Sequence, residues 1–192
     1  MLRRFLSAGL CLGLTTLAFA PDVHAQPNER SGLLLGASIG LGNSSPDQCQ
    51  DCKTGLAVEG RIGTALTPRL TLLASASSVA AAPNVLSDRR GRHQAFIAAL
   101  QYWLSDRFWL RAGGGVATVE REEPGLFDYS TSHAAGLAGI GLEINPRSKI
   151  VFELALQDLL SGSSPARFPG EPTQKSTVNT LILTVGVTFY SR

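Results

Sequence analysis

Residues 100–116 read LQYWLSDRFWLRAGGGV, and two runs of alternating side chains meet there at the short polar turn 105–107. Before the turn, one face of an extended chain is apolar: Phe96, Ala98, Leu100, Tyr102 and Leu104. After the turn, one face is again apolar: Phe108, Leu110, Ala112, Gly114 and Val116. A period of two residues is the pattern of a β-strand. A three-residue turn that pairs Leu104 with Phe108 keeps both apolar sets on one side of the sheet, so this stretch predicts an antiparallel hairpin.

The same strand–turn–strand unit occurs twice more. Leu66 and Leu70 flank the turn Thr-Pro-Arg at 67–69, and Ile144 and Ser148 flank Asn-Pro-Arg at 145–147. The three turns begin at residues 67, 105 and 145, so the spacings are 38 and 40 residues. A repeat of this length holds two strands of about ten residues, one tight turn and one longer loop, and about ten residues is what a membrane-spanning strand needs.

The alternation extends over most of the chain. Besides the central hairpin, we expect strands at 32–41, 54–66, 70–81, 132–144, 149–159 and 176–190, separated at one end by long loops at 42–53, 82–92, 120–131 and 160–175. Eight strands joined alternately by short turns and long loops predict an all-β fold, an eight-stranded antiparallel up-and-down transmembrane β-barrel.

Residues 1–25 have the pattern of a signal peptide and are excluded from the fold. Arg3 and Arg4 precede the apolar run 5–20, and small residues at Val23 and Ala25 suit cleavage before Gln26. An alternative cut after Ala20 would leave proline next to the scissile bond. The predicted barrel domain is therefore 26–192, with 15 basic and 14 acidic residues. That balance argues against nucleic acid as a partner, because nucleic-acid-binding domains usually carry a strong basic excess.

Five charged residues fall on the polar face of the strands: Glu59, Arg61, Arg111, Glu143 and Glu153. In a membrane barrel the apolar face meets lipid and the polar face fills the lumen, whereas in a soluble lipocalin-like barrel the apolar face points inward. Tyr102, Phe108 and Phe189 lie near the short-turn end, where an aromatic girdle would sit. We therefore expect the five charges to form a paired cluster that closes the lumen to ions, because an unpaired buried charge is costly.

The chain resembles the small eight-stranded outer-membrane β-barrel proteins of Gram-negative bacteria. The residues that carry the resemblance are the three Thr-Pro-Arg-type turns at 67–69, 105–107 and 145–147, the Arg-Ala-Gly-Gly-Gly stretch at 111–115, and the ending Leu-Thr-Val-Gly-Val-Thr-Phe-Tyr at 183–190. The resemblance covers residues 31–190 and implies a location in the bacterial outer membrane. It does not specify an activity, since such barrels include adhesins, small-solute pores and lipid-modifying enzymes. One departure is that Ser191 and Arg192 follow Tyr190, whereas the family usually ends on an aromatic residue.

Cys49 and Cys52 are the only cysteines left after removal of the signal peptide. A redox-active pair would normally open a helix of an α/β fold, and a zinc site would need further ligands nearby. On an oxidising export route, we expect a structural disulfide within the first long loop.

Two histidines, His93 and His133, lie near the long-loop ends of their strands. Outer-membrane lipid deacylases and acyltransferases use a histidine with a serine and an acidic residue at that level. Ser132 and His133 could form such a set with an acidic residue of the third loop, namely Glu120, Glu122 or Glu123. The spacing does not match a His-x-Ser motif, because alanines follow His133. We therefore expect polar strand-end histidines, no catalysis and no cofactor.

The loop 82–92 is basic and the loop 120–131 is acidic. Arg89, Arg90 and Arg92 are suited to bind lipopolysaccharide phosphates, with solvated loop tips as the alternative. The sequence thus favours a monomeric outer-membrane barrel with a structural or surface-interaction role, whose partners are outer-membrane lipid and lipopolysaccharide. The alternatives are a narrow pore or conduit for small or hydrophobic solutes and, third, a lipid-modifying enzyme.

Overall fold

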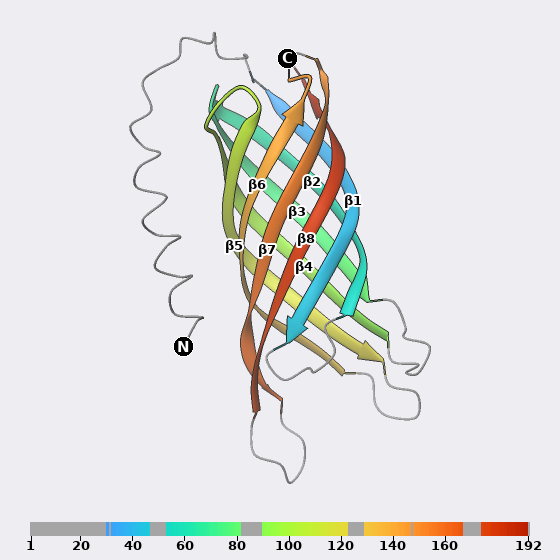
Figure 1. The fold of residues 1–192 in the computed structure, drawn as a ribbon. Coiled ribbons are helices and arrows are strands. Elements are labelled where there is room, and N and C mark those ends of the chain that lie inside the picture. Colours follow the sequence, from blue (N-terminus) through green and yellow to red (C-terminus); the bar gives the residue numbers. More distant parts are fainter. Residues whose placement is uncertain are drawn as a thin grey trace, which may run out of the picture.

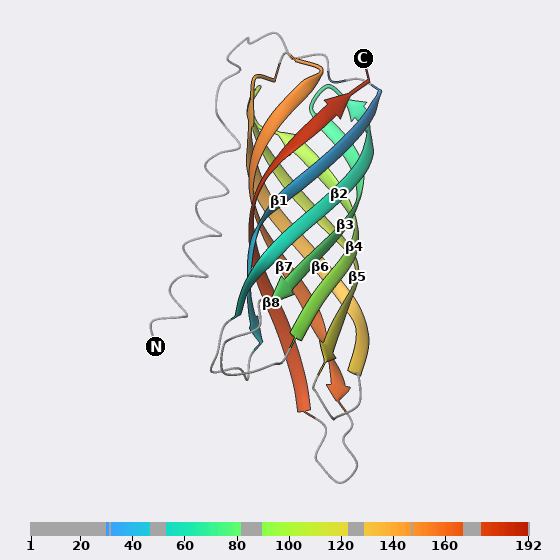
Figure 2. The same ribbon diagram turned by 90° about the vertical axis from the view of Figure 1, so that its right-hand side faces the viewer.

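Eight antiparallel strands close into one barrel in the computed structural model of the chain (Figures 1 and 2). The strands are β1 (Leu33–Pro46), β2 (Lys53–Thr67), β3 (Leu70–Ala81), β4 (Arg90–Trp103), β5 (Phe108–Glu122), β6 (Tyr129–Ile144), β7 (Ile150–Ala166) and β8 (Gln174–Tyr190). The structure describes residues 30, 32–46, 53–81, 90–122, 129–146, 148–166 and 174–191. Each strand pairs with its neighbours in the chain and β1 pairs with β8, which confirms the predicted up-and-down barrel.

The predicted signal peptide, residues 1–25, lies outside the described residues and stays a prediction. No helix within the described part of the chain is long and apolar enough to cross a membrane.

The register of the strands sets their tilt. Following directly paired residues from Gly36 of β1 through every strand in turn leads back to β1 at Pro46, an offset of ten residues. Such an offset tilts the strands against the barrel axis, and an eight-stranded barrel is only about wide enough for side chains to fill its interior. The lumen is therefore a place where inward-pointing side chains from distant strands meet.

Several strands are longer than the sequence predicted, mainly at the long-loop end. β1 continues to Pro46 rather than ending at residue 41, and β7 continues to Ala166 rather than residue 159. β4 begins at Arg90 and β5 ends at Glu122, so charged residues that we expected in loops are part of strands. The apolar alternation stops where the lipid-facing surface ends, but backbone pairing does not depend on it and continues.

Two of the three short connections differ from the prediction. Thr67 pairs with Leu70 after a bulge at Leu66, so the first turn has only two residues between its paired positions. The third connection is longer than expected, because β6 ends at Ile144 and β7 begins at Ile150. In the central hairpin the amide of Leu104 donates to the carbonyl of Phe108 at 2.9 Å, as the predicted three-residue turn requires.

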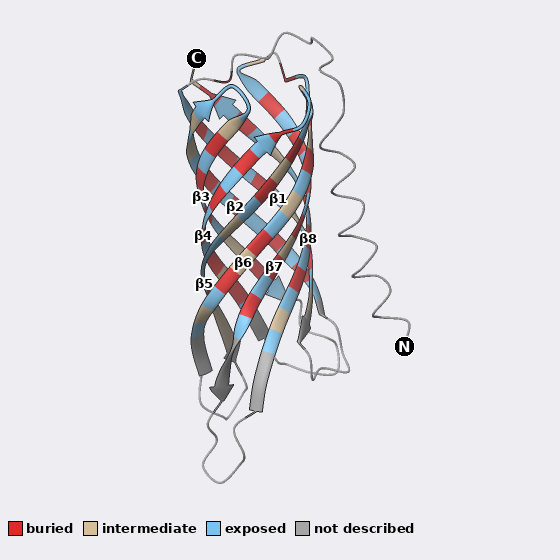
Figure 3. Ribbon diagram, turned by 90° about the vertical axis from the view of Figure 1, so that its left-hand side faces the viewer, coloured by how far each residue is buried: buried red, intermediate tan, exposed pale blue. Residues whose placement is uncertain are grey.

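Buried and exposed residues alternate along the strands (Figure 3). The apolar set points outward: Phe96 is 63% exposed and Phe108 is 56% exposed. The predicted girdle residues Tyr102 and Phe189 also face outward near the short-turn end. A continuous apolar outer band with charges inside is the arrangement of a membrane barrel, and it excludes the soluble lipocalin-like alternative.

Candidate functional site

Arg111 of β5 lies at the centre of a buried polar cluster in the lumen. Its Nη1 atom is 3.0 Å from Glu59 Oε1 on β2, and its Nε and Nη2 atoms donate to Gln101 Oε1 at 3.0 and 2.7 Å. Gln157 of β7 closes the ring, accepting from Arg111 at 3.2 Å and donating to Glu59 at 2.9 Å. Because each residue comes from a different strand, the cluster joins the barrel walls across the lumen.

A second ion pair lies beside the first. Arg61 Nη2 is 2.7 Å from Glu153 Oε1, and the same nitrogen donates to the hydroxyl of Thr188 at 2.5 Å. Arg61 Nη1 is also 3.7 Å from Glu59, so Glu59 lies between two guanidinium groups. The structure thus brings together four of the five charged residues that the strand pattern directs inward.

The fifth, Glu143, pairs with a residue that sequence reasoning missed. Arg30 precedes β1, and its Nη2 atom lies 2.7 Å from Glu143 Oε2 at the short-turn end. Tyr190 donates its hydroxyl to Glu143 Oε1 at 2.6 Å. With Arg30 the described lumen contains three arginines and three glutamates in ion pairs, so the charges balance.

A signal for Arg30 did exist in the sequence. The inward set contained two arginines against three glutamates, and a buried carboxylate without a partner is strongly unfavourable. The imbalance required one more cation, but Arg30 lies outside any alternating run and so carries no strand periodicity.

Two tryptophans stack against these arginines. The guanidinium carbon of Arg30 is 4.4 Å from the ring centroid of Trp103, and that of Arg111 is 4.6 Å from Trp109. Both tryptophans are 1% exposed and belong to the inward face of the hairpin that decides the fold. Cation–π contacts of this kind strengthen where water is excluded.

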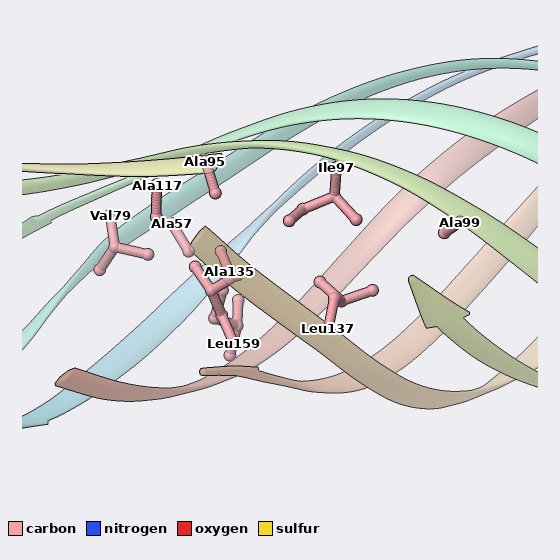
Figure 4. Packing of buried hydrophobic residues seen from close by; sticks show 10 residues of the cluster. Ala57, Val79, Ala95, Ile97, Ala99, Ala117, Ala135, Leu137 and Leu159 are labelled. Atoms are coloured by element: carbon pink, nitrogen blue, oxygen red, sulfur yellow. The ribbon is translucent and has the colours of Figure 1, made fainter. Parts of the chain in front are cut away.

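The lumen is not polar throughout. Towards the long-loop end it is filled by an apolar cluster consisting of Ala57, Val79, Ala95, Ile97, Ala99, Ala117, Ala135, Leu137, Leu159 and Ile182. Figure 4 shows Ile97 of β4 and Leu137 of β6 pointing toward each other, with the small alanines around them. The polar face that we expected to fill the lumen therefore does not fill this half.

A small cavity lies where the polar and apolar parts meet. Its volume is about 10 Å³, and its lining includes Glu59, Val79, Leu137 and Ile182. That is close to the smallest volume that holds one water molecule.

Within the described strands, the serine and the neighbouring histidine considered for catalysis lie on opposite faces of β6. Ser132 is exposed on the outer face of β6 and shares a hydrogen bond with Thr118 at 3.0 Å, while its neighbour His133 has the opposite, inward parity. His93 is buried, and its Nδ1 atom lies 2.9 Å from the hydroxyl of Thr180. Among the described residues, no group of three or more histidine, cysteine, aspartate or glutamate side chains could hold a metal ion.

The basic and acidic segments are neighbours rather than separate loops. Arg90 pairs in register with Glu122, and Arg92 with Glu120, across the β4–β5 ladder. Directly opposite residues have their Cβ atoms about 5 Å apart, so the opposite charges of Arg92 and Glu120 stabilise the pairing. Cys49, Cys52, Arg89 and Glu123 lie outside the described residues, so the disulfide and the complete basic segment stay predictions.

No protein-family model matches this chain, and no curated protein sequence matches it. Among solved structures, Neisserial surface protein A (NspA) is 12% identical, with a TM-score of 0.64 over 84% of this chain and 98% of that chain. Ail, the attachment invasion locus protein of Yersinia pestis, is 17% identical, with a TM-score of 0.51 over 83% of this chain and 99% of that chain. A complex of Ail with the heparin analogue sucrose octasulfate is 15% identical, with a TM-score of 0.50 over 82% and 99%. The chain therefore has the fold of the small eight-stranded outer-membrane β-barrels.

Proposed function

We propose that the chain is an integral outer-membrane protein with a sealed lumen, which acts through its outer and extracellular surfaces rather than by catalysis or transport. The observation that carries this proposal is the charge-balanced cluster of Arg30, Arg61, Arg111 and their three glutamate partners across the barrel interior. A structural or surface-interaction role is what remains for a barrel that neither conducts nor reacts.

The energetics of the cluster support a closed lumen. The side chains of Arg111 and Glu59 are 0% and 4% exposed, so an ion entering the lumen would have to separate a buried ion pair. Removing one partner of a buried pair costs about 3–5 kcal/mol. An ion passing further would then meet the apolar cluster, where it would lose its hydration without gaining a ligand.

The surface beyond the apolar band is available for interaction. Arg92 is exposed there, in register with Glu120 of the next strand. We include contact between lipopolysaccharide phosphates and Arg89, Arg90 and Arg92 in the proposal, because arginine binds phosphate through paired hydrogen bonds. The glutamates on β5 lower the net positive field, so this contact is local pairing with single phosphates rather than long-range attraction.

Anionic glycans are the second class of ligand to test. Ail, whose fold this chain shares, was crystallised with a heparin analogue, and sulfate groups make the same hydrogen bonds with arginine as phosphates do.

Cell fractionation with site-specific labelling tests the proposal. The protein is expressed in a Gram-negative host with Cys49 and Cys52 replaced by serine, and one new cysteine is placed at Ser132 or at Ser105. We expect the protein in the outer-membrane fraction, with a membrane-impermeant maleimide labelling Ser132→Cys but not Ser105→Cys on intact cells. Recovery of the protein in the soluble periplasmic fraction would contradict the proposal.

A further inference from the structure

At the short-turn end of the lumen, the guanidinium of Arg30 lies among Trp103, Asp106 and Glu143 of the barrel. We propose that these groups form a guanidinium-binding pocket that is occupied in cis, so that Arg30 acts as a removable latch on the periplasmic mouth. The inference rests on the proposed function, because it assumes that the lumen is otherwise sealed and that the short turns face the periplasm.

Three groups hold the Arg30 guanidinium. Its Nη2 atom donates to the carbonyl of Asp106 at 2.6 Å and to Glu143 Oε2 at 2.7 Å, while the ring of Trp103 lies 4.4 Å from the guanidinium carbon. The Arg30 side chain is 3% exposed. A carboxylate, a carbonyl and an aromatic face together match a cation that is planar and donates in several directions.

The barrel builds this pocket without help from the latch. Trp103 ends β4, Asp106 lies in the β4–β5 turn, Glu143 lies in β6, and Tyr190 ends β8. The hydroxyl of Tyr190 donates to Glu143 Oε1 at 2.6 Å, which fixes the carboxylate independently of Arg30. The amide of Glu143 also donates to the carbonyl at position 107 at 2.8 Å, tying the turn to β6. We therefore expect the pocket to persist when Arg30 is removed.

Arg30, in contrast, is not part of any strand ladder. Gly32 separates it from β1 with a φ of 79°, a conformation that glycine adopts without strain. A Cβ atom at this position would lie 2.2 Å from the carbonyl oxygen of Ser191, so only glycine allows the chain to pass the end of β8 here. Before β1, the structure describes one side chain, that of Arg30, and the pocket holds it in place.

Removal of Arg30 leaves the buried carboxylate of Glu143 without its ion-pair partner. Glu143 is 0% exposed, and Arg30 is its only ion-pair partner among the described residues. An empty pocket would therefore expose Trp103 to small solutes and favour binding of a free cation, while the Arg111 cluster deeper in the lumen stays intact. Free guanidinium should rescue the variant, and urea, which has the same shape but no charge, should not.

Tryptophan fluorescence provides a direct readout, because the chain has only two tryptophans, Trp103 and Trp109. In a Trp109→Phe background, quenching by acrylamide reports on Trp103 alone. We expect quenching to rise severalfold in Arg30→Ala and to stay unchanged in Arg107→Ala, which removes an exposed arginine from the neighbouring turn. Guanidinium chloride, at concentrations too low to unfold the barrel, should restore the low quenching of Arg30→Ala. Equal urea or sodium chloride should not.

The outcomes test the latch and the guanidinium site separately. Unchanged quenching in Arg30→Ala would overturn the latch, and equal effects of guanidinium and urea would overturn the guanidinium site. If Arg30→Ala does not refold, Arg30→Lys keeps the positive charge but loses the planar stack. Raised quenching in that variant supports the guanidinium site, and wild-type quenching contradicts it. Steady ion conduction by the wild-type protein would refute the sealed lumen instead, so failure of the proposed function and failure of the latch are separate results.

Discussion

Replacing Arg111 with methionine removes the guanidinium at the centre of the lumen while keeping a side chain of similar length. The lost contacts are the ion pair with Glu59 at 3.0 Å, two hydrogen bonds with Gln101 at 3.0 and 2.7 Å, one with Gln157 at 3.2 Å and the stack over Trp109. The carboxylate of Glu59 then keeps fewer donors at a buried site.

The expected loss in the free energy of unfolding depends on the groups that still contact Glu59. Breaking a buried ion pair by removing one partner costs about 3–5 kcal/mol. Glu59 retains a hydrogen bond from Gln157 at 2.9 Å, one from Ser38 at 3.3 Å, and Arg61 at 3.7 Å. Because these groups still stabilise the charge, we expect a loss at the lower end, about 3 kcal/mol.

We measure this loss by equilibrium unfolding in urea, with the protein refolded into lipid vesicles. The comparison requires that the slope of the unfolding free energy with urea concentration is the same for both proteins. Arg69→Met, which removes an exposed arginine from the first turn, is the matched control and should be neutral within about 0.5 kcal/mol. Adding Glu59→Gln to Arg111→Met should recover part of the loss, because it removes the unpaired charge. An Arg111→Met protein as stable as the control, or a double variant less stable than the single one, would refute the reasoning.

Three further predictions concern packing, redox state and the outer surface. Gly141→Ala should destabilise the barrel by about 2 kcal/mol, because a Cβ atom there would lie 2.2 Å from the ring of Trp109. Gly136→Ala is the control and should be neutral in the same unfolding assay, because its Cβ atom would meet nothing nearer than 4.0 Å. Cys49 and Cys52 should resist alkylation in the exported protein until a reductant is added, and quantitative alkylation of both thiols without reduction would rule out the disulfide. Arg92→Ala should weaken binding of lipopolysaccharide to the refolded protein, measured by co-sedimentation, and an unchanged affinity would remove this arginine from the proposed contact.

The strand pattern predicted the architecture because lipid and lumen impose opposite demands on alternate residues. Period-two alternation and the direction of each face followed directly from residues such as Phe108 and Arg111. The ends of the strands could not be predicted in this way. Beyond the apolar band both faces of β1 and β7 are polar or small, and only the backbone ladder continues. The bulge at Leu66 was also missed, because an added residue leaves the composition of the turn unchanged.

The charge cluster in the lumen could be predicted only in part from the sequence. Sequence parity gives the side of the wall on which Glu59 or Glu153 lies, but it does not give the partner across the lumen, which depends on the ten-residue offset of the closed barrel. Arg30 could be inferred only as an unidentified cation that balances the third glutamate. The apolar half of the lumen was not predicted, because small inward-facing alanines do not stand out from the glycines and serines of the polar face.

Single-channel recording on the refolded wild-type protein in a planar bilayer tests the central claim most directly. With three buried ion pairs across the lumen and an apolar cluster beyond them, the account predicts insertion without conductance steps. The Arg111→Met protein, recorded under the same conditions, shows whether removing the central cation is enough to admit ions. Steady, well-resolved conductance of the wild-type protein would contradict the sealed lumen and make the narrow pore the better description.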